Sequence, residues 1–165
     1  IIKNNDTIIF CFGEVDCRAH LIKQFKIQNK KVGEIIYDCV NRLLETIMYF
    51  KNKGFNVVAY GPVASFKDEN SNKIPVNRWY GNEKLRNKVT EYFNCVYKIL
   101  CKKNNIPFFT IFYHLIQKDL KSKDEYHLDD CMHYSNKVIP FILEEMLSIK
   151  LINIEQKYQG LNDII

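Results

Sequence analysis

The sequence has no apolar run long enough to cross a membrane and no cysteine pair with metal-binding spacing. A transmembrane helix needs roughly 20 consecutive apolar residues, and no stretch of this chain reaches that length. The six cysteines include no Cys-x-x-Cys pair and lack the dense spacing of small secreted domains. No signal peptide is visible. We therefore expect reduced thiols, a cytoplasmic location and no membrane partner.

The sequence also lacks a concentrated patch of one charge. Its 24 basic and 19 acidic residues give a net charge of +5, and the lysines are spread along the chain. The nearest approaches to clusters are Lys30-Lys31 and Lys102-Lys103. Both lie beside expected helix ends, where basic residues are ordinary solvated charges. A nucleic-acid partner needs a focused basic face, so we expect none.

Internal repeats and low-complexity linkers are absent as well, which argues for one domain. The chain has 165 residues, of which 47% are hydrophobic and 13% aromatic. A chain of this length can bury about two thirds of its unfolded surface. We place one α/β domain at residues 1–150 and leave the tail, 151–165, unassigned.

What the sequence does contain is an alternation of short apolar runs and longer periodic segments. The runs at 7–12, 56–60 and 107–112 are expected strands, and the first reads as buried on both faces, as in a parallel sheet. Apolar residues recur at helical spacing from 32 to 48, then from 83 to 103, and a last helix is expected from about 135 to 150. Residues 13–31 are expected to form a polar loop before the first helix. Strand–helix alternation predicts right-handed crossovers and an α/β fold with a parallel sheet.

Three segments follow the carboxyl ends of these strands, where ligands bind in open parallel sheets. We call them the first, second and third rim segments; they comprise residues 13–20, 61–82 and 114–133. Any site is expected to be built from them.

The first rim segment begins with Gly-Glu-Val-Asp-Cys-Arg at residues 13–18. Gly13 permits a sharp exit from the strand or a close approach of a ligand to the backbone. Glu14, Asp16 and Arg18 are candidates for an ion-paired network, and Arg18 can bind a carboxylate or phosphate in forked fashion. The alternative is a salt bridge that only stabilises the loop.

The third rim segment ends with an Asp three residues before a His. This spacing lets the Asp130 carboxylate turn back onto the His133 imidazole, which orients the ring as a general base. Asp130 can also be a simple loop or capping residue. A metal site is a further alternative, because four possible ligands lie close together: His127, Asp129, Asp130 and His133. His20 and His114 have no comparable neighbours and are expected to be surface or packing residues.

Taken together, these blocks resemble the SGNH (GDSL-like) hydrolase superfamily, and more narrowly its branch with a GEIDCR-like block. The resemblance spans most of the chain. It includes the helix after the first rim segment, the Gly61-Pro62 turn, the Thr-Glu-Tyr-Phe-Asn stretch at 90–94 and the terminal Asp-x-x-His. It implies a three-layer α/β/α sandwich with a parallel sheet of the flavodoxin-like kind. The first β–α units of that fold are expected to lie outside this chain, which begins with Ile1 rather than Met; that segment, or another chain, would complete the sheet.

The resemblance implies roles residue by residue. His133 corresponds to the general base and Asp130 to its orienting acid. Residues 13–16 correspond to the family's Gly-x-Asn-Asp block, in which the Asn helps to hold the oxyanion. This chain has Val15 in place of that Asn, so oxyanion stabilisation is left to backbone N–H groups or to Arg18. The nucleophilic Ser is expected outside this segment.

The function that the resemblance implies is acyl transfer, as an esterase, deacetylase or acetyltransferase acting on a carbohydrate or nucleotide-sugar. No cofactor is expected, apart from acetyl-CoA as the donor if the protein is a transferase. The oxyanion and substrate contacts are expected to come from Gly13, Glu14, Asp16, Arg18, Trp79 and Asn94. Trp79 can stack on a sugar ring or serve as a core lid. Two alternatives are a catalytically inactive domain that binds glycan or protein, and a metal-dependent hydrolase.

Overall fold

Three parallel strands form the centre of the fold. In the computed structural model, residues 3, 6–75, 78–128, 130 and 133–152 are described. The strands are β1 (Thr7–Cys11), β2 (Asn56–Tyr60) and β3 (Phe108–Phe109), in the order β1-β2-β3. Thr7 pairs with Asn56 and Ala59 with Phe108, so all three strands point the same way. The expected α/β class with a parallel sheet is therefore confirmed.

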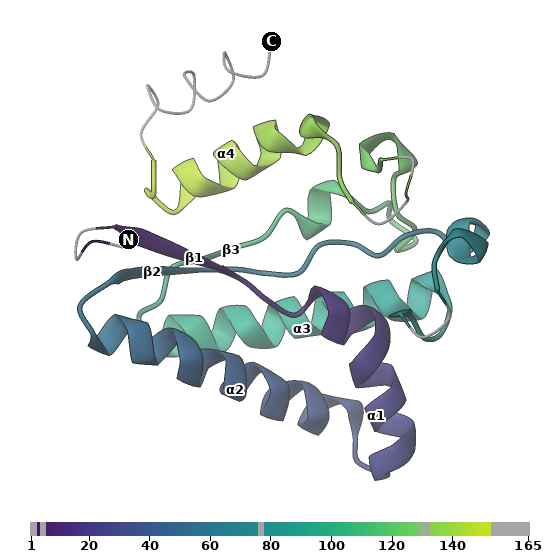
Figure 1. Cartoon of the computed structure of the whole chain (residues 1–165), viewed down its shortest axis with the longest axis horizontal. Coiled ribbons are helices and arrows are strands. Elements are labelled where there is room, and N and C mark those ends of the chain that lie inside the picture. Colours follow the sequence, from purple (N-terminus) through teal and green to yellow (C-terminus); the bar gives the residue numbers. More distant parts are fainter. Residues whose placement is uncertain (1–2, 4–5, 76–77, 129, 131–132, 153–165) are drawn as a thin grey trace.

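Helices lie on both faces of this sheet. Helices α2 (Val32–Asn52) and α3 (Glu83–Lys103) pack together on one face, and α4 (Ile139–Ser148) lies on the other (Figure 1). The main core lies between the sheet and the α2–α3 pair, where Ile36, Ile47 and Phe93 are fully buried. A smaller core beneath α4 contains Phe112 and Leu115. The apolar periodicity of the sequence arises because each long helix has one buried stripe.

Strand β1 differs from the expectation of a strand buried on both faces. Phe10 is buried against the main core, whereas Ile9 and Cys11 are exposed. Successive side chains of a strand point to opposite faces of the sheet. The described apolar cluster on the α4 face includes Tyr60 of β2 but no residue of β1, so the odd-numbered positions of β1 remain open.

The polar loop expected at residues 13–31 is in fact mostly helical. A π-helical turn, η1 (Asp16–His20), leads directly into α1 (Leu21–Gln28). The Cys17 N–H donates to the Gly13 carbonyl at 2.9 Å, which starts the helical run. Leu21 and Ile22 are buried. This apolar stripe is too short to stand out by periodicity alone.

Strand β3 is shorter than the expected run of 107–112. The Thr110 hydroxyl accepts a hydrogen bond from the Phe112 N–H at 3.2 Å, and this turn leads into a 3-10 helix, η4 (Phe112–His114). A threonine hydroxyl that bonds to the backbone two residues ahead competes with strand pairing.

The remaining short helices lie in the second and third rim segments and before α4. They are η2 (Asp68–Lys73), η5 (Asp124–Tyr126) and η6 (Asn136–Val138). Pro140 occupies the first turn of α4, where its missing N–H costs nothing, so this helix begins at Ile139 and not near the expected 135. Within the described residues, none of the helices is long and apolar enough to span a bilayer.

Candidate functional site

The three rim segments meet at one side of the sheet. Figure 1 shows the chain leaving all three strands toward the same side. The Tyr80 N–H donates to the Arg18 carbonyl at 2.7 Å and joins the second segment to the first. The Tyr134 hydroxyl donates to the Ala64 carbonyl at 2.6 Å and joins the end of the third segment to the second. The carboxyl edge of the sheet is therefore where the expected site residues gather.

Asp130 holds His133 through two hydrogen bonds. One carboxylate oxygen lies 2.5 Å from His133 Nδ1, and the other accepts the His133 backbone N–H at 2.9 Å. The double contact fixes both the backbone turn and the ring, as the Asp-x-x-His spacing predicts. The His133 side chain is 74% exposed, and its Nε2 makes no hydrogen bond within the described part of the chain. The ring thus presents one nitrogen to solvent.

Tyr134 links this pair to the second rim segment through the Ala64 carbonyl. Its side chain is half-buried, and desolvation raises the pKa of Tyr134 well above its usual value, with smaller contributions from Tyr60, Glu14 and Glu83. The second rim segment in turn bonds to the first, where the Tyr80 N–H donates to the Arg18 carbonyl. Both candidate motifs are therefore attached to the second rim segment, at the carboxyl edge of the sheet.

Arg18 is an internal residue of the turn. Its Nε donates to Glu14 at 2.6 Å, its Nη1 donates to the Arg78 carbonyl, and its side chain is 7% exposed. This arrangement favours the loop-stabilising alternative for Glu14 and Arg18. A role of Arg18 in oxyanion stabilisation stays a prediction.

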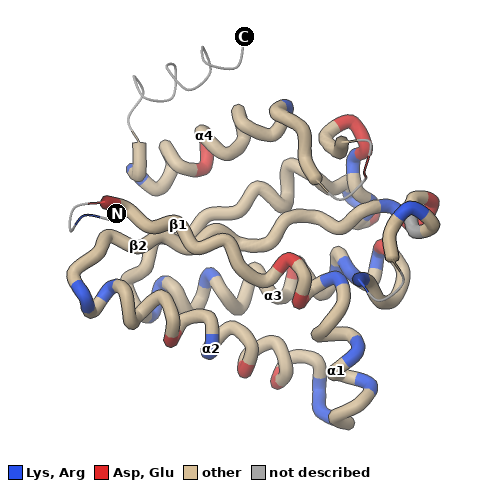
Figure 2. The backbone as a smooth tube through the Cα atoms, viewed as in Figure 1, with Lys and Arg blue, Asp and Glu red and all other residues tan. Residues whose placement is uncertain are grey.

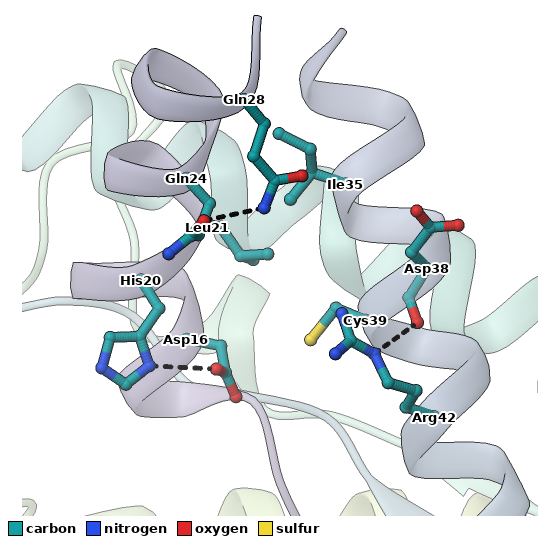
Figure 3. Close-up of a pocket in the computed structure, with 9 residues that line it drawn as sticks. All are labelled: Asp16, His20, Leu21, Gln24, Gln28, Ile35, Asp38, Cys39 and Arg42. Atoms are coloured by element: carbon teal, nitrogen blue, oxygen red, sulfur yellow. Dashed lines mark hydrogen bonds and ion pairs between the residues drawn. The ribbon is translucent and has the colours of Figure 1, made fainter. Parts of the chain in front are cut away.

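Asp16 lines a cavity between α1 and α2 (Figure 3). The cavity has a volume of about 490 Å³, and Arg42 lies on its α2 side. Asp16 contacts His20 Nδ1 at 3.2 Å. His20 is exposed, as expected, but it does have a carboxylate neighbour. Residues four positions apart, such as Asp16 and His20, are neighbours only in a helix. This segment was expected to be a loop, so the contact could not be predicted.

Cys39 forms part of the same cavity wall. Burial and, to a smaller extent, the Asp16 charge raise the pKa of Cys39 to about 11, against the opposing effect of Arg42. At neutral pH this thiol is therefore protonated, and it is a poor nucleophile.

The residues that hold the rim segments together are polar side chains on the inner face of α3, which the sequence analysis missed. Arg86 is fully buried and donates to the Ser65 hydroxyl at 2.8 Å and to the Phe66 carbonyl at 2.8 Å. Asn87 accepts the Ser65 N–H at 2.7 Å and donates to the Ser122 hydroxyl at 3.0 Å. These bonds attach the second and third rim segments to one rigid helix.

Two other candidates have positions that favour a structural role. Asn94 is buried, and its Nδ2 donates to the Pro62 carbonyl at 2.9 Å, which fixes the exit of β2. The Trp79 ring meets Phe66 edge-on, with a centroid distance of 6.2 Å, and the Arg86 guanidinium lies 5.5 Å from its centre. This placement favours the core-lid alternative for Trp79, and its contact with a sugar stays a prediction.

The metal alternative finds no support in the described residues. Among them, no group of three His, Cys, Asp or Glu side chains is arranged to hold a metal ion. The His127 ring lies 4.4 Å from the Tyr134 ring and is half-buried. Asp129, the remaining candidate ligand, lies outside the described residues. His114 stacks on Phe141 at 4.6 Å, as expected of a packing residue, but its Nε2 also lies 3.1 Å from the Glu145 carboxylate, a neighbour that was not expected.

Comparison of the chain with models of protein families, with curated proteins and with solved structures found no match.

Proposed function

We propose that Asp130 and His133 are the acid–base half of an acyl-transfer site of the SGNH type, on a three-layer α/β/α fold of that superfamily. The observation that carries the proposal is the double contact of Asp130 with residue 133, which orients the ring and leaves Nε2 exposed. An imidazole oriented in this way takes a proton from a nucleophile and returns it to the leaving group.

The proposed substrate is an acetyl ester or amide of a carbohydrate or nucleotide-sugar. This class rests on the resemblance to the SGNH superfamily and not on a pocket beside His133. The cavity lined by Asp16, Leu21 and Arg42 lies between α1 and α2 and includes no described residue of the third rim segment. In the transferase direction, acetyl-CoA would supply the acyl group.

Stabilisation of the oxyanion is the least complete part of the proposed site. Val15 is exposed and has no donor where the family has Asn, so backbone N–H groups of the turn are left to stabilise the developing charge. One missing donor costs about 10²–10³ in kcat. We therefore expect a slow enzyme.

The test is the hydrolysis of p-nitrophenyl acetate by the full-length protein. His133→Ala should lower kcat/KM by about 10²–10⁴-fold, since this is the usual contribution of a general base. Added imidazole should restore part of the activity, because the ring it replaces is exposed and a small base can enter. His114→Ala is the matched control, because it removes a histidine that packs on Phe141, and it should leave the activity unchanged. Full activity of His133→Ala would refute the proposal.

A second candidate is an inactive SGNH-like domain that binds glycan or protein. Val15 favours it, and so does the state of Ser65 and Ser122, which are buried and bonded within the protein. In the described residues, no serine or cysteine makes a hydrogen bond with His133. A fluorophosphonate probe followed by mass spectrometry separates the two candidates. A labelled residue in the full-length protein supports the enzyme, and glycan binding without any label supports the binding domain.

A further inference from the structure

Helix α1 and the turn that follows it carry basic side chains and no acidic ones. Residues 17–33 contain five basic side chains and no acidic one. Arg18 is buried, but the other four are lysines on the surface of α1 and of the turn into α2. Along α1 itself Figure 2 shows blue segments only, whereas red segments lie on the neighbouring start of α2. The spread of lysines over the whole chain hides this local excess.

Large apolar side chains are exposed on the same helix. Ile27 is 64% exposed and Phe25 is 44% exposed. Phe25 and Val32 also open into an apolar groove of about 410 Å³ between α1, α2 and α3. Phe25 and Ile27 are two positions apart on α1 and face different sides of it, so the exposed apolar groups surround the end of the helix. We call this surface the α1 corner; it consists of Lys23, Phe25, Lys26, Ile27, Lys30, Lys31 and Val32.

The charges of the α1 corner are only partly neutralised. Within the described residues, the side-chain ammonium groups of Lys23 and Lys31 make neither an ion pair nor a hydrogen bond. Lys30 lies 3.6 Å from Asp38, and Lys26 donates to the Tyr80 hydroxyl at 3.1 Å. The corner therefore presents a net positive charge to any partner.

We propose that the α1 corner docks the protein on an anionic phospholipid surface. A short helix with lysines around exposed apolar side chains fits the headgroup region, where the lysines meet lipid phosphates and the apolar side chains enter the acyl boundary. A nucleic acid would use the lysines but leaves Ile27 in water. This proposal does not depend on the acyl-transfer function, and it would bring the protein to substrates at a membrane.

The experiment is sedimentation of the full-length protein with vesicles. Phosphatidylcholine vesicles that contain phosphatidylserine should bind the protein at low salt, and phosphatidylcholine alone should not. High salt should release it, because exposed charges are screened. Ile27→Asp and the double change Lys30→Glu with Lys31→Glu should each lower the bound fraction at least about tenfold.

Two matched controls lie on α3. Ile99 is 65% exposed, so Ile99→Asp places the same charge at an equally exposed apolar site. Lys102→Glu with Lys103→Glu makes the same change of net charge at an exposed lysine pair. Both controls should bind like the unchanged protein. Circular dichroism checks that each variant is folded.

Three results would overturn the proposal. The first is the absence of binding to phosphatidylserine vesicles at low salt. The second is an equal loss in the α3 controls, which would show that only net charge matters. The third is binding to duplex DNA that competes with the vesicles and is insensitive to Ile27→Asp, which would point to nucleic acid as the partner.

Discussion

Gly13 has two separate reasons to be glycine. Its φ angle is +97°, a conformation that side chains with a Cβ disfavour. A Cβ added there would also lie 2.7 Å from ring carbons of Phe93, which is fully buried in the main core. Gly54, at the end of α2, has only the first reason: its φ is +88°, and nothing lies within 4 Å of an added Cβ.

The pair of glycines separates backbone strain from steric clash. Gly54→Ala should lower the free energy of unfolding by about 1 kcal/mol, the cost of an unfavourable φ. Gly13→Ala should lower it by about 3 kcal/mol, because the Phe93 ring must move as well. Urea denaturation of both variants measures the difference. Equal losses would show that Phe93 adjusts freely and does not fix the turn.

The acidic residues show what residue types alone can predict. The contact between Asp130 and His133 follows from their spacing in a turn, and the structure contains it. The split between Glu14, which pairs with Arg18, and Asp16, which lines the cavity, could not be predicted. It depends on the π-helical turn, and the polar composition of residues 13–20 had indicated a loop.

At the scale of elements, α3 shows where apolar periodicity fails. Its bounds agree with the expected 83–103, yet Leu85, one of the apolar residues at helical spacing in that segment, is exposed. Beside the buried apolar residues Val89 and Phe93, this helix buries five polar ones; they are Glu83, Arg86, Asn87, Thr90 and Asn94. They recur at helical spacing and form a stripe of their own. A polar stripe is normally solvated, and only the position of the rim segments explains why this one is buried.

Arg86 should be the most sensitive position of this stripe. Arg86→Met keeps much of the side-chain volume but leaves the Gly81 and Phe66 carbonyls without their donor. A buried acceptor without a partner costs about 1–3 kcal/mol, so the free energy of unfolding should fall by about 3 kcal/mol. Chemical denaturation measures it. Lys84→Met, on the exposed face of the same helix, is the control and should change stability by less than about 0.5 kcal/mol. Similar small losses of stability in both variants would contradict the conclusion that Arg86 holds the second rim segment on α3.

At the scale of the whole molecule, the order of strands and helices could be predicted, but the depth of burial could not. Alternation of apolar runs and periodic segments gave the parallel sheet and the long helices α2 and α3 nearly to the residue. Whether β1 is covered on both faces depends on which elements reach it, and the apolar content of 7–12 carries no such information. The cysteines report this pattern of burial, since Cys17 and Cys101 are buried whereas Cys11 and Cys95 are exposed.

Alkylation of the native protein should follow that pattern. With iodoacetamide near pH 8, Cys95 and Cys11 should react first and Cys39 later, while Cys17 and Cys101 should react only after unfolding. Mass spectrometry of the labelled peptides gives the order. The reason is both access and ionisation, because the thiolate is the reactive form. Burial raises the pKa of Cys39 to about 11, so only about one thousandth of it is ionised at pH 8.

The same buried thiols should make stability fall at alkaline pH. Burial raises the pKa of Cys101 to about 12 and the pKa of Cys17 well above its usual value. In the unfolded chain these thiols ionise near pH 8.5, so above that pH the unfolded state binds fewer protons than the native state. The free energy of unfolding must then decrease as pH rises from about 8.5 toward the native pKa values. Cys101→Ala removes one of these groups and should flatten the decrease, whereas Cys95→Ala, at an exposed site, should not. An unchanged slope in Cys101→Ala would mean that this thiol is hydrated in the native protein.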